Sequence, residues 1–239
     1  MKVLLPKQHG AWAMLIIPYW LCVIAAGFQW VHIPFFIGWF FIYLTTYPLL
    51  TIIKTKKPRD LLKWVYLYVS LAIIFIAIPF MYNPEIILFS IFLLPLFAFN
   101  IYFASTNNER DLLNDICAVI VFSIAGLIAG FLSEGFISEL VWVVAILSFF
   151  FFLGSIFYVK TMIREKTNIT YKWVSWIYHG LLVVVSLLFG QFIIAAAFLF
   201  SAIRAVAFYG KKITIKKVGI YEIVNSVWFS VFVIIYILN

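Results

Sequence analysis

Apolar residues in this chain form long uninterrupted stretches that alternate with short polar connections. Each stretch is about 17 to 25 residues long, which is the length that a helix needs to cross the hydrocarbon core of a bilayer. The apolar positions are continuous and do not alternate with polar ones, so they indicate helices and not barrel strands. The pattern predicts nine transmembrane helices, over residues 11–28, 32–53, 61–81, 85–105, 112–132, 138–159, 173–190, 191–209 and 220–238.

Composition leads to the same class. The chain has 239 residues, of which 66% are hydrophobic and 11% charged, and its mean hydropathy is +1.13. Soluble domains are roughly half apolar and a quarter charged, so this chain has too little polar surface to cover a water-facing globule. Because nine spans use most of the length, we expect an all-α polytopic membrane bundle that forms a single transmembrane helical domain over residues 1–239.

The 17 Lys and Arg residues fall beside every second connection. They lie at the N-terminus and after the second, fourth, sixth and eighth spans, and the other connections have none. Cytoplasmic loops carry an excess of Lys and Arg, so we expect a cytoplasmic N-terminus and a multi-pass protein of the cell membrane. Membrane lipids with anionic headgroups account for the net charge of +8, and no nucleic-acid partner is expected.

Acids and amides are dense at the start of the fifth span. Asp111 and Asp115 are one helical turn apart and therefore share a face, where two carboxylates suit a Mg²⁺ ion. Asn114 adds an amide to the same turn. The alternative is that Arg110 neutralises the cluster while the acids cap the helix N-terminus, where the helix dipole favours negative charge. Both interpretations of these residues remain open on the sequence.

Two histidines are candidates for proton transfer. His9 opens the first helix, where simple solvation at the interface is the alternative to a catalytic role. His179 is expected about 10 Å from the cytoplasmic start of the seventh span, a depth at which a titratable side chain usually faces the bundle interior or a water-filled cavity. Its alternative is a neutral histidine bonded to a neighbouring helix. The candidate catalytic residues are His9, Asp115 and His179.

Charged residues also occur in and beside the last four spans. Arg204 and Glu222 lie on consecutive spans and either pair with each other or contact a ligand. Lys160 and Arg164 lie at the end of the sixth span, where snorkelling and anion binding both account for them. These residues predict a polar cavity open to the cytoplasm. The candidate substrate-binding residues are Arg110, Asn114, Lys160, Arg164, Arg204 and Glu222.

The run from Lys7 to Trp12 (Lys-Gln-His-Gly-Ala-Trp), with the later Glu109-Arg110-x-x-x-Asn114-Asp115, resembles the YwiC-like family of small bacterial membrane proteins across essentially the whole chain. More distantly, nine helices with a cytoplasm-facing cavity are similar to the UbiA-type intramembrane prenyltransferases. The first resemblance implies the bacterial inner membrane. The second implies a UbiA-like fold and an isoprenoid or quinone-like ligand.

The same UbiA resemblance implies Mg²⁺ held by Asp-rich motifs after the second and sixth helices. Here those positions carry the segments Lys54 to Asp60 and Lys160 to Glu165, and neither is Asp-rich. The metal roles of that family are therefore not transferred. Asp111 and Asp115 remain metal candidates on their helical spacing alone.

Three functions are compatible with these features. The first is a lipid-handling protein that binds or modifies an isoprenoid, quinone or similar lipid. If it is an enzyme, it is a prenyltransferase-like transferase in which cations stabilise a leaving diphosphate and a carboxylate or histidine acts as base. The second is a transporter of a small molecule or ion, with His179, Arg204 and Glu222 along the path. The third is a non-catalytic membrane partner of a respiratory or biosynthetic complex.

Overall fold

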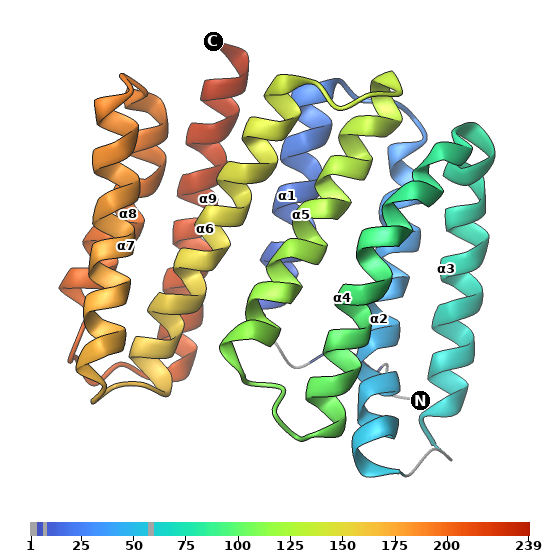
Figure 1. The fold of residues 1–239 in the computed structure, drawn as a ribbon, viewed down its shortest axis with the longest axis horizontal. Coiled ribbons are helices and arrows are strands. Elements are labelled where there is room, and N and C mark those ends of the chain that lie inside the picture. Colours follow the sequence, from blue (N-terminus) through green and yellow to red (C-terminus); the bar gives the residue numbers. More distant parts are fainter. Residues whose placement is uncertain (1–3, 7–8, 57–59) are drawn as a thin grey trace. The chain divides into compact units, whose positions relative to one another are not determined.

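The structure, a computed structural model, describes residues 4–6, 9–56 and 60–239, without the side chain of His9 (Figure 1). All regular structure in this part of the chain is helical, and the described residues form no strand. The all-α prediction is therefore confirmed. The α-helices are α1 His9–Ala26, α2 His32–Thr55, α3 Leu62–Tyr82, α4 Ser90–Ser105, α5 Leu112–Glu134, α6 Glu139–Ile163, α7 Ile169–Leu188, α8 Phe192–Ala207 and α9 Ile215–Leu238.

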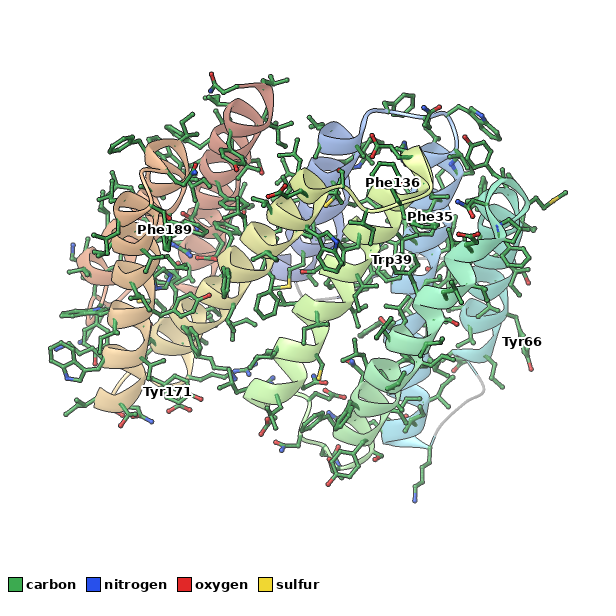
Figure 2. The ribbon with its side chains drawn as sticks, turned by 45° about the horizontal axis from the view of Figure 1, so that its top comes forward. Phe35, Trp39, Tyr66, Phe136, Tyr171 and Phe189 are labelled. Carbon is green, nitrogen blue, oxygen red and sulfur yellow. The ribbon has the colours of Figure 1, made fainter. Side chains whose placement is uncertain are left out.

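Seven of the described segments are long and apolar enough to cross a membrane. Two shorter apolar helices, Gly10–Ala26 and Phe192–Ala207, accompany them. Apolar side chains also cover the surface: on α3, Tyr66 is 68% exposed and projects away from the helices, and Met81 is 82% exposed (Figure 2). A surface so rich in exposed apolar groups suits lipid and not water. The chain is a multi-pass helical membrane protein.

Two helices begin at least four residues earlier than the apolar pattern predicted, because polar residues cap them. The seventh was expected from 173 but begins at Ile169, since the Asn168 side chain accepts hydrogen bonds from two backbone N–H groups of the first turn. The ninth was expected from 220 but begins at Ile215, since the Thr214 hydroxyl accepts from a backbone N–H three residues on. Hydropathy does not register an N-cap or a charged first turn.

The fourth and sixth spans also differ from the expected ranges. The fourth was predicted as one helix over 85–105, but it starts as a 3₁₀ helix, η1 (Pro84–Phe89), before α4. The Asn83 side chain caps η1 by accepting from the backbone N–H of Glu85. Such tight turns are frequent at the N-termini of α-helices. The sixth was expected to end at 159, but α6 continues to Ile163.

The chain divides into two compact units, Met1–Ala145 (unit 1) and Ile146–Asn239 (unit 2). A single domain over 1–239 stays a prediction. In unit 1, α2 packs on α3 and α1 on α5. The start of α1, the α2–α3 connection and the α4–α5 connection lie at one end, which is the lower end in Figure 1. In unit 2, α7 packs on α8 and α8 on α9, and the α6–α7 and α8–α9 connections share an end.

Basic residues lie at one end of each unit. All described Lys and Arg residues of unit 1 lie in or beside the start of α1, the α2–α3 connection or the α4–α5 connection. Those of unit 2 lie in or beside the α6–α7 and α8–α9 connections. We call these the basic ends. The charges expected on Lys2, Lys7, Lys57 and Arg59 lie outside the described residues.

A glycine sets the distance between α1 and α5. A Cβ atom on Gly126 would lie 2.7 Å from the backbone oxygen of Pro18 and 3.0 Å from Sγ of Cys22. Small residues allow this kind of close approach between membrane helices. The pair α1 and α5 therefore depends on glycine at this position.

Gly126→Ala is expected to destabilise the protein by about 1–3 kcal/mol, because the added methyl group meets backbone that cannot rotate away. The matched control is Gly180→Ala on α7, where no described residue lies within 4 Å of the added atom, and we expect a gain of about 0.4–1 kcal/mol there. Thermal unfolding of both variants in the same detergent measures the difference. Equal melting temperatures would show that α1 and α5 do not approach as described.

Candidate functional site

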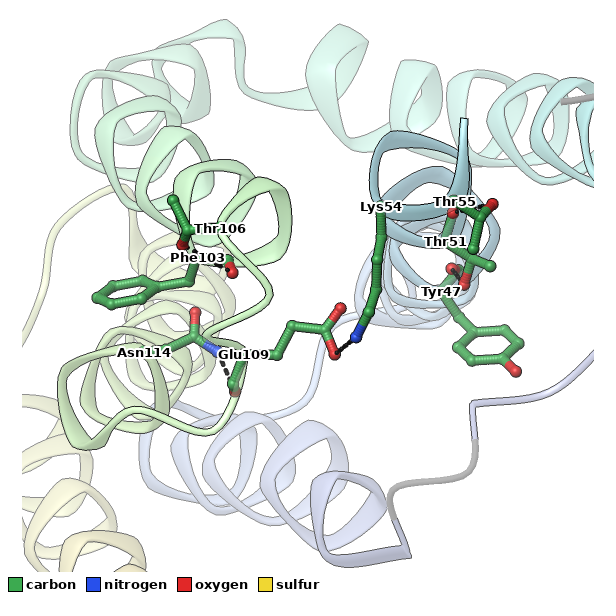
Figure 3. A network of polar contacts seen from close by, with 8 residues as sticks. All are labelled: Tyr47, Thr51, Lys54, Thr55, Phe103, Thr106, Glu109 and Asn114. Atoms are coloured by element: carbon green, nitrogen blue, oxygen red, sulfur yellow. Dashed lines mark hydrogen bonds and ion pairs between the residues drawn. The ribbon is translucent and has the colours of Figure 1, made fainter. Parts of the chain in front are cut away.

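The basic end of unit 1 holds a small polar network (Figure 3). Lys54 reaches from the end of α2 to Glu109 in the α4–α5 connection, with Nζ 3.1 Å from Oε2. The Asn114 side chain on α5 donates to the backbone oxygen of Glu109 at 2.8 Å. Both charged side chains are about one-third exposed, so the ion pair contributes at most about 1 kcal/mol. Its effect is to hold the α4–α5 connection against α2.

Asp111 is the N-cap of α5, as the capping alternative proposed. Its Oδ1 accepts from the backbone N–H of Leu113 at 2.8 Å. Asp115 lies one turn further on, in the first turn of the helix. Among the described residues, no three or more His, Cys, Asp or Glu side chains form a group that could hold a metal ion. The magnesium site at Asp111 and Asp115 stays a prediction, and no step is assigned to it.

A larger polar group occupies the interior of unit 2. Its members come from all four helices of the unit, and six of the seven are no more than 6% exposed. Glu222, the seventh, has a side chain that is 15% exposed. We call this group the polar cluster; it consists of Ser155, Tyr158, His179, Ser201, Arg204, Glu222 and Asn225.

Arg204 is the centre of the polar cluster. Its guanidinium forms an ion pair with Glu222 on α9, so the pairing expected between consecutive helices is present. Its Nη2 atom donates to Oγ of Ser155 on α6 at 3.4 Å. The guanidinium carbon also lies 4.2 Å from the centroid of the Tyr158 ring, a favourable cation–π distance. Two helices of unit 2, α6 and α9, thus contact one buried cation on a third, α8.

His179 faces α6 with one ring nitrogen. Its Nδ1 lies 2.6 Å from the backbone oxygen of Ser175, so Nδ1 carries the hydrogen and donates to its own helix, not to a neighbouring helix as the sequence alternative expected. In the neutral ring Nε2 then has a free lone pair. A Cβ atom on Gly154 would lie 3.0 Å from Nε2, so glycine lets the ring approach α6. Nε2 therefore presents an acceptor lone pair toward α6.

Apart from the two atoms that join Arg204 and Glu222 in the ion pair, four buried atoms of the polar cluster have no hydrogen-bond partner among the described residues. They are Oη of Tyr158, Nε of Arg204, Nδ2 of Asn225 and Nε2 of His179. The first three are donors. A buried donor left unpaired costs about 1–3 kcal/mol, and folded proteins leave few of them without a reason. The excess of donors makes this cluster suited to an anionic or oxygen-rich group.

Apolar layers enclose the polar cluster along the helices of unit 2. Toward the end opposite the basic end, the ring of Phe229 stacks on Phe151 at 4.1 Å and contacts Phe198 at 5.7 Å. Toward the basic end, Met162 and Val218 pack in an apolar core that also includes the Tyr158 ring. The cluster is thus a polar layer between two apolar ones.

An apolar groove of about 570 Å³ runs along α6 and α7. It is lined by Leu153 and Phe157 of α6 and by α7 residues that include Trp173 and Tyr178. The Tyr178 hydroxyl donates to the backbone oxygen of Phe150 at 2.9 Å, which joins the two helices. Leu153 and Tyr178 are the sequence neighbours of Gly154 and His179, so the groove and the polar cluster use adjacent faces of the same two helices.

The remaining candidates lie elsewhere in the two units. Lys160 is in the last turn of α6 and only 7% exposed, while Arg164 follows the helix and is exposed. Arg110 is exposed beside the Asp111 cap of unit 1. The side chain of His9 lies outside the described residues. Within one unit, the structure therefore brings together His179, Arg204 and Glu222 from the predicted set.

Sequence reasoning missed Ser155, Ser201 and Gly154. The signal on α6 is present but weak: Ser148 and Ser155 are seven residues apart, and Tyr158 follows three later, so all three share one face of an otherwise apolar helix. Small polar residues at such spacing mark helix–helix contacts in membranes. The hydrogen-bond partner of Ser155, however, is Arg204, which is 49 residues away in the sequence.

The helices and the two polar sites define a polytopic α-helical membrane protein with ionisable groups inside its bundle. Comparison with known proteins identifies its family: the family model described as YwiC-like protein matches residues 5–130. The chain belongs to this YwiC-like family, as the resemblance of its His-Gly-Ala-Trp segment indicated.

Two relatives match over nearly the whole chain. The uncharacterized protein YwiC of Bacillus subtilis is 42% identical over 229 residues, covering 96% of each chain. An uncharacterized protein of Haemophilus influenzae is 35% identical over 235 residues, covering 98% of this chain and 99% of its own. No solved structure matches this chain.

Proposed function

We propose that the protein binds an isoprenoid, quinone or similar lipid in unit 2. The apolar chain of the lipid lies in the groove along α6 and α7, and its polar head reaches the polar cluster. The observation that carries the proposal is the set of three buried donors without partners, on Tyr158, Arg204 and Asn225.

The chemistry of these donors selects the head of the lipid. A guanidinium offers a planar fork that matches phosphate and carboxylate oxygens, and Nε of Arg204 is still available for it. The hydroxyl of Tyr158 and the amide of Asn225 add two neutral donors. A groove of about 570 Å³ is within the usual range for binding a small apolar molecule. An oxygen-rich head on an apolar chain satisfies both features.

The proposal includes the setting of the site. We take the basic ends to be cytoplasmic, in agreement with the positive-inside rule, and the membrane to be the cytoplasmic membrane. We also propose that the chain crosses it nine times in a UbiA-like arrangement. If the protein transfers the prenyl group of the bound lipid, His179 acts as the base, because its Nε2 holds a lone pair. Lys160 and Arg164 lie at the basic end of unit 2, by which we propose that the head of the lipid enters.

Thermal unfolding in the presence of chosen lipids tests the proposal. Farnesyl diphosphate, farnesol and a quinone with an isoprenoid tail are added separately to the purified protein. We expect farnesyl diphosphate or the quinone to raise the melting temperature by several degrees, and farnesol to raise it less, because ligand that binds only the folded state stabilises it. The absence of a response to all three would contradict the proposal.

Tyr158→Phe separates ligand binding from folding. The Tyr158 hydroxyl has no hydrogen-bond partner in the described part of the chain, so its removal is expected to leave the stability of the lipid-free protein unchanged or slightly higher. Lipid affinity is expected to fall about tenfold, the equivalent of one hydrogen bond. Titration of the lipid measures the affinity. Tyr236→Phe, on α9 outside the polar cluster, is the control, and equal affinities of the two variants would exclude a role for Tyr158.

A second candidate function is ion or proton transport, favoured by the presence of His179, Arg204 and Glu222 inside one unit. Ionisable groups in membrane helices often mark ion and proton paths. Flux into proteoliposomes distinguishes this candidate from lipid binding. A pH- or ion-driven flux that is lost in Glu222→Gln would favour transport, whereas no flux across a panel of ions and solutes would reject it.

A further inference from the structure

The end of unit 1 opposite its basic end carries only acidic charge. The α1–α2, α3–η1 and α5–α6 connections meet the membrane boundary there with Glu85, Glu134 and Glu139, and without a Lys or Arg. Among the described residues, no cation pairs with Glu85. This end of unit 1 therefore presents uncompensated negative charge.

An apolar groove of about 380 Å³ opens at the same end. It is formed by η1, the start of α4, the end of α5 and the start of α6, all within unit 1. Most of its walls are aromatic. The lining includes Glu85, Phe89, Phe92, Phe131, Ile137 and Trp142.

One of the three acidic residues lines this groove, and the other two lie on helices that line it. Glu85 lines it directly. Glu134 lies three residues after Phe131 on α5, and Glu139 three residues before Trp142 on α6, so each shares a helical face with a lining aromatic residue. The groove thus combines aromatic walls with the Glu85 carboxylate, and two further acids lie on the same helical faces as its lining residues.

We propose that this groove binds a lipid whose headgroup carries a primary ammonium. The acyl chain packs on the aromatic walls, and the ammonium donates charge-assisted hydrogen bonds to the Glu85 carboxylate. Trp142, which is 46% exposed and lines the groove, supplies an aromatic ring for a cation–π contact with the same ammonium. An anionic headgroup is disfavoured there, because three carboxylates without a nearby cation repel it. This site is independent of the lipid proposed for unit 2.

A competition between headgroups tests the proposal. The purified full chain is mixed with phosphatidylethanolamine, phosphatidylglycerol and phosphatidylcholine that share the same palmitoyl and oleoyl chains, and bound lipid is counted by native mass spectrometry. We expect a preference of about fivefold or more for phosphatidylethanolamine over phosphatidylglycerol. Phosphatidylcholine is expected to bind less well than phosphatidylethanolamine, since its quaternary ammonium has no N–H to donate.

Glu85→Gln is expected to remove most of this preference, while Asp60→Asn, an exposed acid at the basic end of unit 1, retains it. Both positions are on the surface, so both variants are expected to fold, and their thermal unfolding checks this. A wild-type protein without headgroup preference overturns the proposal. So does a preference that Glu85→Gln leaves intact, or equal binding of phosphatidylcholine and phosphatidylethanolamine. Failure here leaves the unit 2 proposal unaffected, because the two use different residues and different lipids.

Discussion

Glu222→Leu is expected to lower the free energy of unfolding by about 3–5 kcal/mol, the largest effect of any single change considered. The substitution leaves the guanidinium of Arg204, only 1% exposed, as a buried charge without its counter-ion. Breaking one side of a buried ion pair is costly for this reason. Reversible unfolding in mixed micelles, followed by circular dichroism, measures the loss.

The double variant Arg204→Met with Glu222→Leu is the matched control. Replacing both members of a buried pair by apolar residues of similar size is often close to neutral, so we expect it to recover most of the stability. A single variant as stable as the wild type would show that Arg204 is not held as a buried, paired cation. If the double variant recovered stability but not lipid binding, the ion pair would be needed to bind the lipid and not to stabilise the fold.

His32→Ala is expected to cost about 2–4 kcal/mol, although His32 is at a helix start and carries no proposed chemistry. Nδ1 accepts from the backbone N–H of Gln29 at 2.9 Å, so Nε2 carries the hydrogen and donates to the backbone oxygen of Ala129, also at 2.9 Å. The Tyr19 hydroxyl donates to the backbone oxygen of His32 at 2.7 Å. The ring is fully buried, and its removal takes a hydrogen-bond partner from the backbone N–H of Gln29 and from the backbone oxygen of Ala129.

Gln29→Ala is the control for His32. Gln29 takes part in this contact through its backbone N–H, and its side chain is exposed, so we expect a change within about 0.5 kcal/mol. Thermal unfolding of both variants provides the comparison. If His32→Ala were no less stable than Gln29→Ala, the buried histidine would not join the α1–α2 connection to α5.

Features set by composition and charge were predictable from the sequence. Long apolar stretches predicted the helical membrane class, and the alternation of Lys and Arg predicted which connections share an end in each unit. Helix ends were less predictable, because they depend on single capping side chains. Asn168 and Thr214 add polar first turns to α7 and α9 that an apolar pattern cannot contain.

The polar sites were predictable only where one residue type is rare in an apolar helix. Arg204 and Glu222 stand out in that way, and their pairing followed from their place on consecutive spans. The structural role of His32 could not be predicted in this way, because its partner Ala129 is 97 residues away and contributes only a backbone oxygen. Gly154 and Ser155 are ordinary residues for a membrane helix, and only the positions of His179 and Arg204 give them a role.

Native mass spectrometry of lipids retained by the gently extracted protein tests the central proposal most directly. The wild type is predicted to carry about one molecule of a lipid with an isoprenoid chain and an oxygen-rich head, and Tyr158→Phe to carry markedly less of it. The double variant at Arg204 and Glu222 is predicted to lose it. Retention of only bulk phospholipids, in the same proportions in all three proteins, would contradict lipid binding at the polar cluster.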